Sequence, residues 1–189
     1  MANAARVSMT ADAYFAWERT QQTKHEFHEG EVFAMAGASV RHNAIRDAFG
    51  GELYLAQRGG PCRSLSSDQR VSMKYRERYA YPDITIVCGT AEVEEGSRDV
   101  ITNPKVVVEV LSKSTEAYDR GEKWQGYRGI ASLDDYVLVS QRAASIEHFQ
   151  RQRDGSWRYS VAGPGETLRL SHGAELVVDR IYEGAFDLP

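Results

Sequence analysis

The run Val106-Val107-Val108-Glu109-Val110-Leu111 decides the fold, because it sets one charged residue inside a strongly apolar pattern. Its valines and leucine predict a β-strand that is buried on both faces. A carboxylate inside such a strand is costly unless a cation or hydrogen-bond donors contact it. Glu109 therefore needs a partner that its own strand does not supply.

A second carboxylate, Asp83, stands in a similar position. Tyr81-Pro82-Asp83 leads directly into the apolar run Ile84-Thr85-Ile86-Val87-Cys88. Proline is tolerated at the first residue of a strand, so Asp83 is expected where its strand begins. Acids on two neighbouring strands predict a metal site. The alternative is that Glu109 pairs with a buried arginine or lysine while Asp83 caps a turn.

The length of 189 residues and the net charge of −4 limit the class of protein. The length fits one domain over residues 1–189, with 1–9 disordered or extended and 145–189 forming an antiparallel β extension. No stretch approaches the roughly 20 apolar residues of a membrane span, and the first residues lack the apolar core of a signal peptide. These features favour a cytoplasmic protein without membrane contact, and the negative charge gives no support to non-specific nucleic-acid binding.

The two cysteines, Cys62 and Cys88, are too few for a disulfide framework and lack the spacing of metal ligands. This usage suits a reducing cytoplasm. Cys88 ends an apolar run and is interpreted as a small buried hydrophobe.

The first half of the chain predicts two helices, a hairpin and a strand. The helices cover 11–21 and, after a cap at Ser39, residues up to 57. Between them, 24–36 predicts a hairpin that turns at Glu29-Gly30. Residues 66–74 alternate as in a half-exposed strand, 75–79 form a charged turn, and 91–99 an acidic surface loop. His42 lies at the edge of the apolar stripe of the second helix, where a histidine is either a packed residue or a catalyst.

A helix over 115–130 follows the Glu109 strand. Asp119, Lys123 and Tyr127 are four residues apart, so all three share one helical face. A strand–loop–helix connection can bring that face over the end of the strand. The alternative is a solvent-exposed Asp119–Lys123 pair. A short buried strand at 136–139 and strand-like runs at 145–150, 157–161, 167–170 and 176–178 complete the chain.

These residues together resemble the prokaryotic restriction endonuclease family often called Uma-two, within the PD-(D/E)XK nuclease superfamily. The matching positions, which span roughly residues 10–185, are Glu26, Gly30, His42, Ser67-Asp68, Tyr81-Pro82-Asp83, Val107 to Ser112, Ser114-Thr115, Asp119-Arg120, Lys123, Tyr127 and Leu133 to Tyr136. The resemblance implies a restriction-endonuclease-like α/β fold, in which helices flank a mixed central sheet.

The resemblance also implies that Asp83 and Glu109 are the two acids of the superfamily motif. One departure is important, because Leu111 stands where that motif has a lysine. Lys123 on the following helix is the expected substitute. Lys113 is the nearer alternative, but its direction is not fixed by the sequence.

The implied chemistry is metal-assisted hydrolysis of phosphodiester bonds, with DNA as the nucleic-acid partner. Asp83, Glu109 and the Val110 carbonyl would hold Mg²⁺, for which Mn²⁺ is the expected substitute. Lys123 would orient water or stabilise the charge on the phosphate. The remaining candidate catalytic residues, which would bind the metal or position water, are Glu26, His42 and Tyr127.

The alternative function is a catalytically inactive nucleic-acid-binding or homo-oligomeric module that keeps the nuclease fold. The net charge and the missing motif lysine favour this alternative, whereas the two acids and Lys123 favour the enzyme. A homodimer is expected in either case, because the strands after residue 145 leave an edge and place Phe149, Trp157 and Tyr159 in an alternating, exposed pattern.

Overall fold

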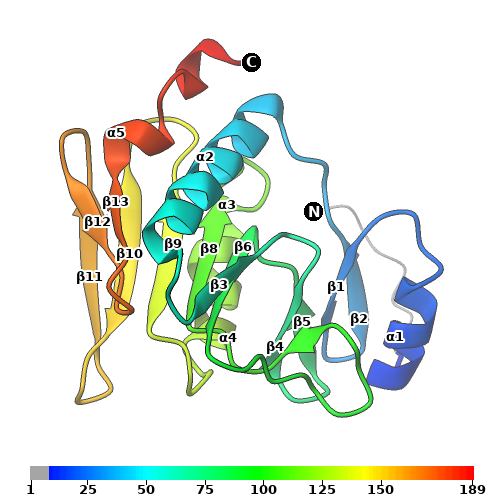
Figure 1. Ribbon diagram of the computed structural model, residues 1–189. Helices are drawn as coiled ribbons and strands as arrows, with labels where there is room; N and C mark the ends of the chain where they lie inside the picture. Colours follow the sequence, from blue (N-terminus) through cyan, green and yellow to red (C-terminus); the bar gives the residue numbers. More distant parts are fainter. Residues whose placement is uncertain (1–8) are drawn as a thin grey trace.

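The Glu109 strand lies in the middle of a six-stranded mixed sheet (Figure 1). Across the sheet the strands are β11 (Trp157–Ala162), β10 (Ile146–Arg151), β9 (Asp135–Val139), β8 (Val106–Val110), β6 (Ile84–Cys88) and β3 (Cys62–Leu65). β8 and β9 run parallel, and the other neighbouring pairs are antiparallel. The computed structural model describes residues 9–189.

Alternation along β8 determines where Glu109 points. Val106, Val108 and Val110 pack into the core on one face of the sheet, together with Ile45 and Phe49. Val107 packs into a second core on the opposite face. Successive side chains of a strand point to opposite faces, so Glu109 shares the face of Val107.

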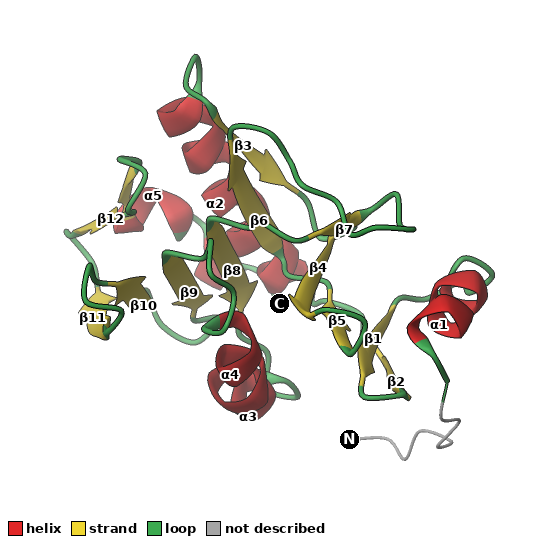
Figure 2. Ribbon diagram, turned by 90° about the horizontal axis from the view of Figure 1, so that it is seen from below, coloured by secondary structure: helices red, strands yellow, loops and turns green. Residues whose placement is uncertain are grey.

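Helices cover both faces of this sheet (Figure 2). On one face lie α2 (Val40–Gln57), α5 (Val178–Ile181) and the separate hairpin of β12 (Thr167–Arg169) and β13 (Glu175–Val177). On the other face lies a continuous helical segment of α3 (Glu116–Tyr118), the π-helix η1 (Asp119–Lys123) and α4 (Trp124–Tyr127). A 3₁₀ turn, η2 (Ala185–Asp187), lies near the end of the chain.

A second sheet supplies the wall beside the helical segment. Its order is β2 (Glu31–Ala34), β1 (His25–His28), β5 (Arg78–Ala80), β4 (Arg70–Lys74) and β7 (Val100–Ile101). Helix α1 (Ala11–Glu18) packs on it through an aromatic core that includes Tyr14, Phe15, Phe27 and Tyr79. This packing orders β1 and therefore places Glu26, which lies within that strand.

Most predicted elements are confirmed, including the α/β class, the mixed sheet flanked by helices, the first hairpin, and α2 with its Ser39 cap. The half-exposed strand at 66–74 is wrong, because β4 begins at Arg70 and both Arg70 and Ser72 are buried. The second sheet explains this burial, since α1 covers Arg70 with aromatic rings. The turn at 75–79 is shorter than predicted, because β5 begins at Arg78.

The interpretation of the cysteines as free thiols is also wrong. Cys62 of β3 and Cys88 of β6 form a disulfide. The antiparallel register places them directly opposite each other, with 3.9 Å between their Cα atoms. Strand pairing, which their spacing in the sequence does not show, brings the two sulfurs together.

The C-terminal β extension divides into two parts. β10 and β11 continue the central sheet, and only β12 and β13 form a separate antiparallel pair. Phe149 and Trp157 are partly buried rather than exposed, because both rings contact Trp124. Tyr159 is 53% exposed, as predicted.

The prediction for the N-terminal segment can be checked only in part. Of the segment expected to be disordered or extended, residues 1–8 lie outside the described part of the structure, and the Met9 N–H donates to the Gly30 carbonyl at 2.9 Å. Within residues 9–189, none of the helices has the length and apolar character needed to cross a membrane.

Candidate active site

Glu109 is met by two donors from the helical segment that covers its face of the sheet. Lys123 Nζ lies 3.0 Å from Glu109 Oε1, and the Tyr127 hydroxyl donates to the same oxygen at 3.1 Å. Both Glu109 and Lys123 are almost fully buried, at 4% and 5% exposure. The prediction that Lys123 reaches Glu109 is confirmed, and the solvent-exposed alternative for Asp119 and Lys123 is wrong.

Lys123 is shared by acids from three different elements. Besides Glu109 of β8, its ammonium lies 2.9 Å from Glu26 Oε1 of β1 and 3.5 Å from Asp119 Oδ1 of η1. Three buried carboxylates therefore surround one buried cation. This acidic cluster, defined as Glu26, Glu109 and Asp119, carries more negative charge than Lys123 can balance when all of them are ionised.

The titration of these groups reflects both burial and the excess of acids. Burial raises the pKa of Glu109 well above its ordinary value; Lys123 opposes this rise, and the charges of Asp119, Asp83 and Glu26 add to it. Burial likewise raises the pKa of Asp119. For Lys123, burial opposes the charged form, but the attraction of Glu109 and Glu26 outweighs it and raises the pKa well above the usual range.

A π-helical turn places Asp119 and Lys123 toward the sheet. The Tyr136 hydroxyl of β9 donates to the Asp119 backbone carbonyl at 2.9 Å, at the first residue of this turn. A side chain that bonds a backbone carbonyl in this way is a recognised cause of helix irregularity, and π-bulges are frequent at functional sites. Both Asp119 and Lys123 are buried as a result.

Asp83 and His42 form a second group beside the acidic cluster. Asp83 Oδ2 accepts a hydrogen bond from the Val110 N–H at 2.7 Å and lies 3.2 Å from His42 Nε2. Val110 follows Glu109 in the chain, so the two groups meet at the end of β8. The buried His42 Nδ1 has no hydrogen-bond partner within residues 9–189.

All six residues predicted for the site therefore lie around the end of β8, in these two adjoining groups. Glu26, Lys123 and Tyr127 surround Glu109, and His42 contacts Asp83. Lys113 is exposed in the loop after β8 and makes no contact with either acid among the described residues. Asp119, which the sequence places on the same helical face four residues before Lys123, completes the cluster.

The oxygen donors at this site fit a hard divalent cation. Within residues 9–189, no three histidine, cysteine, aspartate or glutamate side chains converge as ligands of one ion. Mg²⁺, however, is commonly held by one or two carboxylates with water completing its shell. Asp83 and Glu109 are two carboxylates of this kind, and Asp83 accepts from the N–H of Val110, the residue that follows Glu109.

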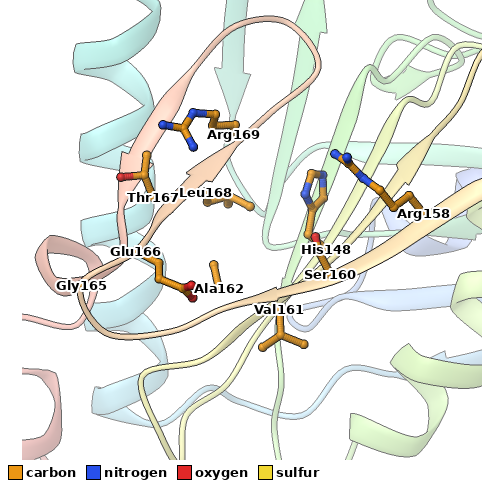
Figure 3. Close-up of a pocket in the computed structure, with 10 residues that line it drawn as sticks. All are labelled: His148, Arg158, Ser160, Val161, Ala162, Gly165, Glu166, Thr167, Leu168 and Arg169. Carbon is orange, nitrogen blue, oxygen red and sulfur yellow. The ribbon is translucent and has the colours of Figure 1, made fainter.

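A separate cavity lies between β10–β11 and the β12–β13 hairpin (Figure 3). It measures about 720 Å³ and is lined by none of the six site residues. The His148 ring is held at 2.7 Å by the buried Asp135, and the Thr167 and Arg169 side chains point away from that ring in Figure 3. His148 in this cavity is therefore already paired with Asp135.

Comparison with known proteins identifies the family. Residues 11–179 match the Uma2 family model, which is described as "Putative restriction endonuclease". The chain belongs to the Uma2 family. This membership confirms the resemblance seen in the sequence, and in this Uma2 protein the ammonium beside Glu109 belongs to Lys123.

Two relatives from Synechocystis and one solved structure are also similar to this chain. The uncharacterized protein slr1290 is 35% identical over 177 residues, covering 93% of this chain and 92% of its own length. The uncharacterized protein sll1609 is 32% identical over 149 residues, covering 79% of this chain and 84% of its own. A crystal structure described as a putative nuclease belonging to DUF820, from Anabaena variabilis, has a TM-score of 0.75 at 14% identity, with 94% of this chain and 99% of that chain covered. At that identity the likeness shows a shared fold.

Proposed function

We propose that this Uma2 protein is a Mg²⁺-dependent endonuclease that hydrolyses phosphodiester bonds in DNA. The observation that carries the proposal is the Lys123 ammonium, which lies 3.0 Å from Glu109 although it comes from a different element than the usual motif lysine. Family membership supports the same reading. The site holds the groups that this hydrolysis requires: a lysine, an acid at the end of a central strand and a second acid at the start of the neighbouring strand.

Asp83, Glu109 and the Val110 carbonyl would hold the ion. When bound, Mg²⁺ supplies positive charge at the phosphate and lowers the pKa of a water molecule. Asp83 is already oriented for this role, because the Val110 N–H fixes its Oδ2 at 2.7 Å.

Lys123 holds its proton throughout, because its pKa is raised well above its ordinary value by Glu109 and Glu26. The fixed positive charge of its ammonium, which donates to Glu109, would stabilise negative charge that develops on a nearby phosphate. Glu26 and Asp119 restrain the ammonium from two further sides.

Tyr127 and His42 complete the set in different ways. Burial, followed by the charge of Glu109, raises the pKa of Tyr127 well above its ordinary value, so it remains a neutral hydroxyl that donates to Glu109. His42 contacts Asp83 through Nε2, which leaves Nδ1 to bind water or a phosphate oxygen. Tyr127 is a positioning residue in this scheme.

Plasmid cleavage tests the proposal. We expect the purified protein to nick or cut supercoiled DNA with Mg²⁺ or Mn²⁺ but not with EDTA, and we expect Asp83→Asn and Glu109→Gln to abolish cleavage. Lys123→Met should reduce it by about 100-fold or more, the scale of a lost electrostatic group. Arg169→Gln, on the exposed β12–β13 hairpin, is the control and should cleave normally.

Metal binding gives an independent measurement. Calorimetry should show Mg²⁺ or Mn²⁺ binding that Asp83→Ala removes. Full cleavage by either acid variant would contradict the metal site. DNA binding without any cleavage would instead favour a catalytically inactive module that keeps the nuclease fold.

A further inference from the structure

A smaller cavity of about 180 Å³ opens at the C-terminal ends of the parallel strands β8 and β9. Its lining includes Arg41, Ser112, Lys113, Ser140, Gln141 and Arg142. Ligands of α/β sheets bind beyond the carboxyl ends of parallel strands, so this position is a favourable one. We call this cavity the basic pocket.

The basic pocket concentrates positive charge in a protein whose net charge is −4. Arg41, Lys113 and Arg142 all line it, and the one acid in its lining is Glu116. That acid is already shared, since Glu116 contacts Arg142 at 3.3 Å and Arg120 at 3.1 Å. The lining therefore keeps a surplus of positive charge.

Two of these cations lack an anionic partner. Arg41 donates from Nε and Nη2 to the Leu188 carbonyl at 3.0 and 2.6 Å, and a neutral carbonyl does not cancel its charge. Lys113 is exposed and its side chain makes no ion pair or hydrogen bond with any residue from 9 to 189. Both charges are available to an anion that enters from solvent.

The basic pocket adjoins the candidate active site through the chain itself. Arg41 precedes His42, which contacts Asp83, and Leu111 in the pocket wall follows Val110, whose N–H binds Asp83. Gln141 fixes the wall, since its amide donates to the Leu111 carbonyl at 2.7 Å and accepts from Ser39 Oγ at 2.9 Å. In Figure 1, the β8 arrow points toward the upper end of the molecule, where α2 begins.

We infer that the basic pocket binds a backbone phosphate of the DNA next to the phosphate that is cleaved. This inference rests on the proposed nuclease function and names where the flanking part of its substrate lies. Guanidinium, ammonium and hydroxyl groups are the side chains that contact nucleic-acid phosphates. Such contacts hold the strand in register without reading its sequence, so cleavage is positioned from a neighbouring phosphate.

Salt-dependent DNA binding tests the inference. Binding of a short fluorescein-labelled DNA duplex is followed by anisotropy with Ca²⁺ in place of Mg²⁺. We expect Lys113→Gln/Arg142→Gln to weaken binding by about tenfold or more and to reduce the slope of log affinity against log salt by about 1, since one phosphate contact is lost. The matched control, Arg158→Gln/Arg169→Gln, removes the same charge at the larger cavity and should keep the wild-type slope.

Several outcomes would overturn the inference: no DNA binding by the wild type, wild-type binding by the pocket variant, or an equal loss in the control. A pocket-dependent thermal shift with inorganic phosphate, without any loss of DNA affinity, would assign a free anion instead and also overturn it. Failure of the proposed function is distinguishable, because pocket-dependent binding would then persist while plasmid DNA stays uncut with Mg²⁺ and Mn²⁺.

Discussion

At the scale of single residues, the buried charge of Lys123 matters most to the electrostatics of the site. An exposed pair between Asp119 and Lys123, the alternative that the sequence leaves open, would contribute only about 0.3–0.5 kcal/mol to stability. Its loss would then leave the stability almost unchanged. Lys123 is instead 5% exposed and lies within 3.5 Å of three carboxylates. Removing a cation from such a site leaves buried charges without compensation.

Lys123→Met should therefore destabilise the protein by about 3–5 kcal/mol near neutral pH, the cost of breaking a buried ion pair. The loss should shrink near pH 5, because the raised pKa values of Glu109 and Asp119 allow these acids to take up protons. Urea unfolding at both pH values measures this. Lys113→Met is the exposed control and should change stability by less than about 0.5 kcal/mol. Equal stability of wild type and Lys123→Met would contradict the buried cluster.

The raised pKa of Glu109 predicts a second pH dependence of stability, which is to be measured without divalent ions. Its pKa in the folded protein is raised above the unfolded value, so its contribution to stability is present below the unfolded pKa and is lost as the pH rises through the folded pKa. Glu109→Gln removes this titration. The variant should gain in melting temperature relative to the wild type as the pH rises above the ordinary pKa of a glutamate. Parallel melting curves across this rise in pH would show that Glu109 does not titrate abnormally.

At the scale of elements, two glycines of the helical segment allow the effect of helix propensity on stability to be measured apart from the effect of packing. A Cβ at Gly121, in the π-helical turn, would meet nothing within 4 Å. A Cβ at Gly126 would lie 2.5 Å from Met73 Sδ and 3.3 Å from Arg78 Nη1. The second position is thus a close approach of α4 to the neighbouring sheet, which sets the position of Tyr127.

Gly121→Ala should stabilise the protein by about 0.5–1 kcal/mol, because alanine loses less backbone entropy in a helix. Gly126→Ala should destabilise it, since overpacking costs about 1–3 kcal/mol and exceeds the gain in helix propensity. The free energy of unfolding in urea measures both changes. A more stable Gly126→Ala protein would mean that Met73 and Arg78 move aside freely.

The disulfide between β3 and β6 ties an edge strand to the strand that Asp83 precedes. Reduction should lower the free energy of unfolding by about 2–4 kcal/mol, the usual contribution of such a link. Alkylation in denaturant checks its presence, since Cys62 and Cys88 should react only after reduction. Cys62→Ser/Cys88→Ser should be insensitive to reductant. Complete alkylation of the unreduced protein would show that Cys62 and Cys88 are not bonded.

At the scale of the whole molecule, the central sheet ends in the edge strand β11. Tyr159 and Val161 on this strand are 53% and 50% exposed, although the neighbouring Phe149 and Trp157 are covered by Trp124. Exposed apolar edges are usually paired or covered in native proteins. The expected homodimer would bury this edge and bring together two sites for the two strands of DNA.

Light scattering at tens of micromolar tests this assembly. The wild type should be a dimer, and Tyr159→Lys should be a monomer because a charge is placed on the paired edge. Tyr54→Lys changes an equally large exposed tyrosine on α2 and should remain dimeric. A monomeric wild type would show that the edge stays unpaired.

The sequence by itself indicated the strands that follow Asp83 and contain Glu109, and its resemblance to a known family added Glu26 and His42 to the site. The apolar run around Glu109 indicated a strand buried on both faces, and the spacing of Asp119, Lys123 and Tyr127 placed them on one face of the following helix. These features depend on local geometry, which a single stretch of chain expresses. The same local signals gave α2, the first hairpin and the start of β6.

Only the tertiary structure decided which distant groups meet. Glu26 reaches Lys123 because the second sheet packs beside the helical segment, and Cys62 meets Cys88 because of the register of β3 and β6. The π-helical turn arises with a hydrogen bond from Tyr136, on another strand, and the burial of Arg70 depends on α1. Each of these contacts joins segments far apart in sequence, and their energies depend on burial, which no local pattern specifies.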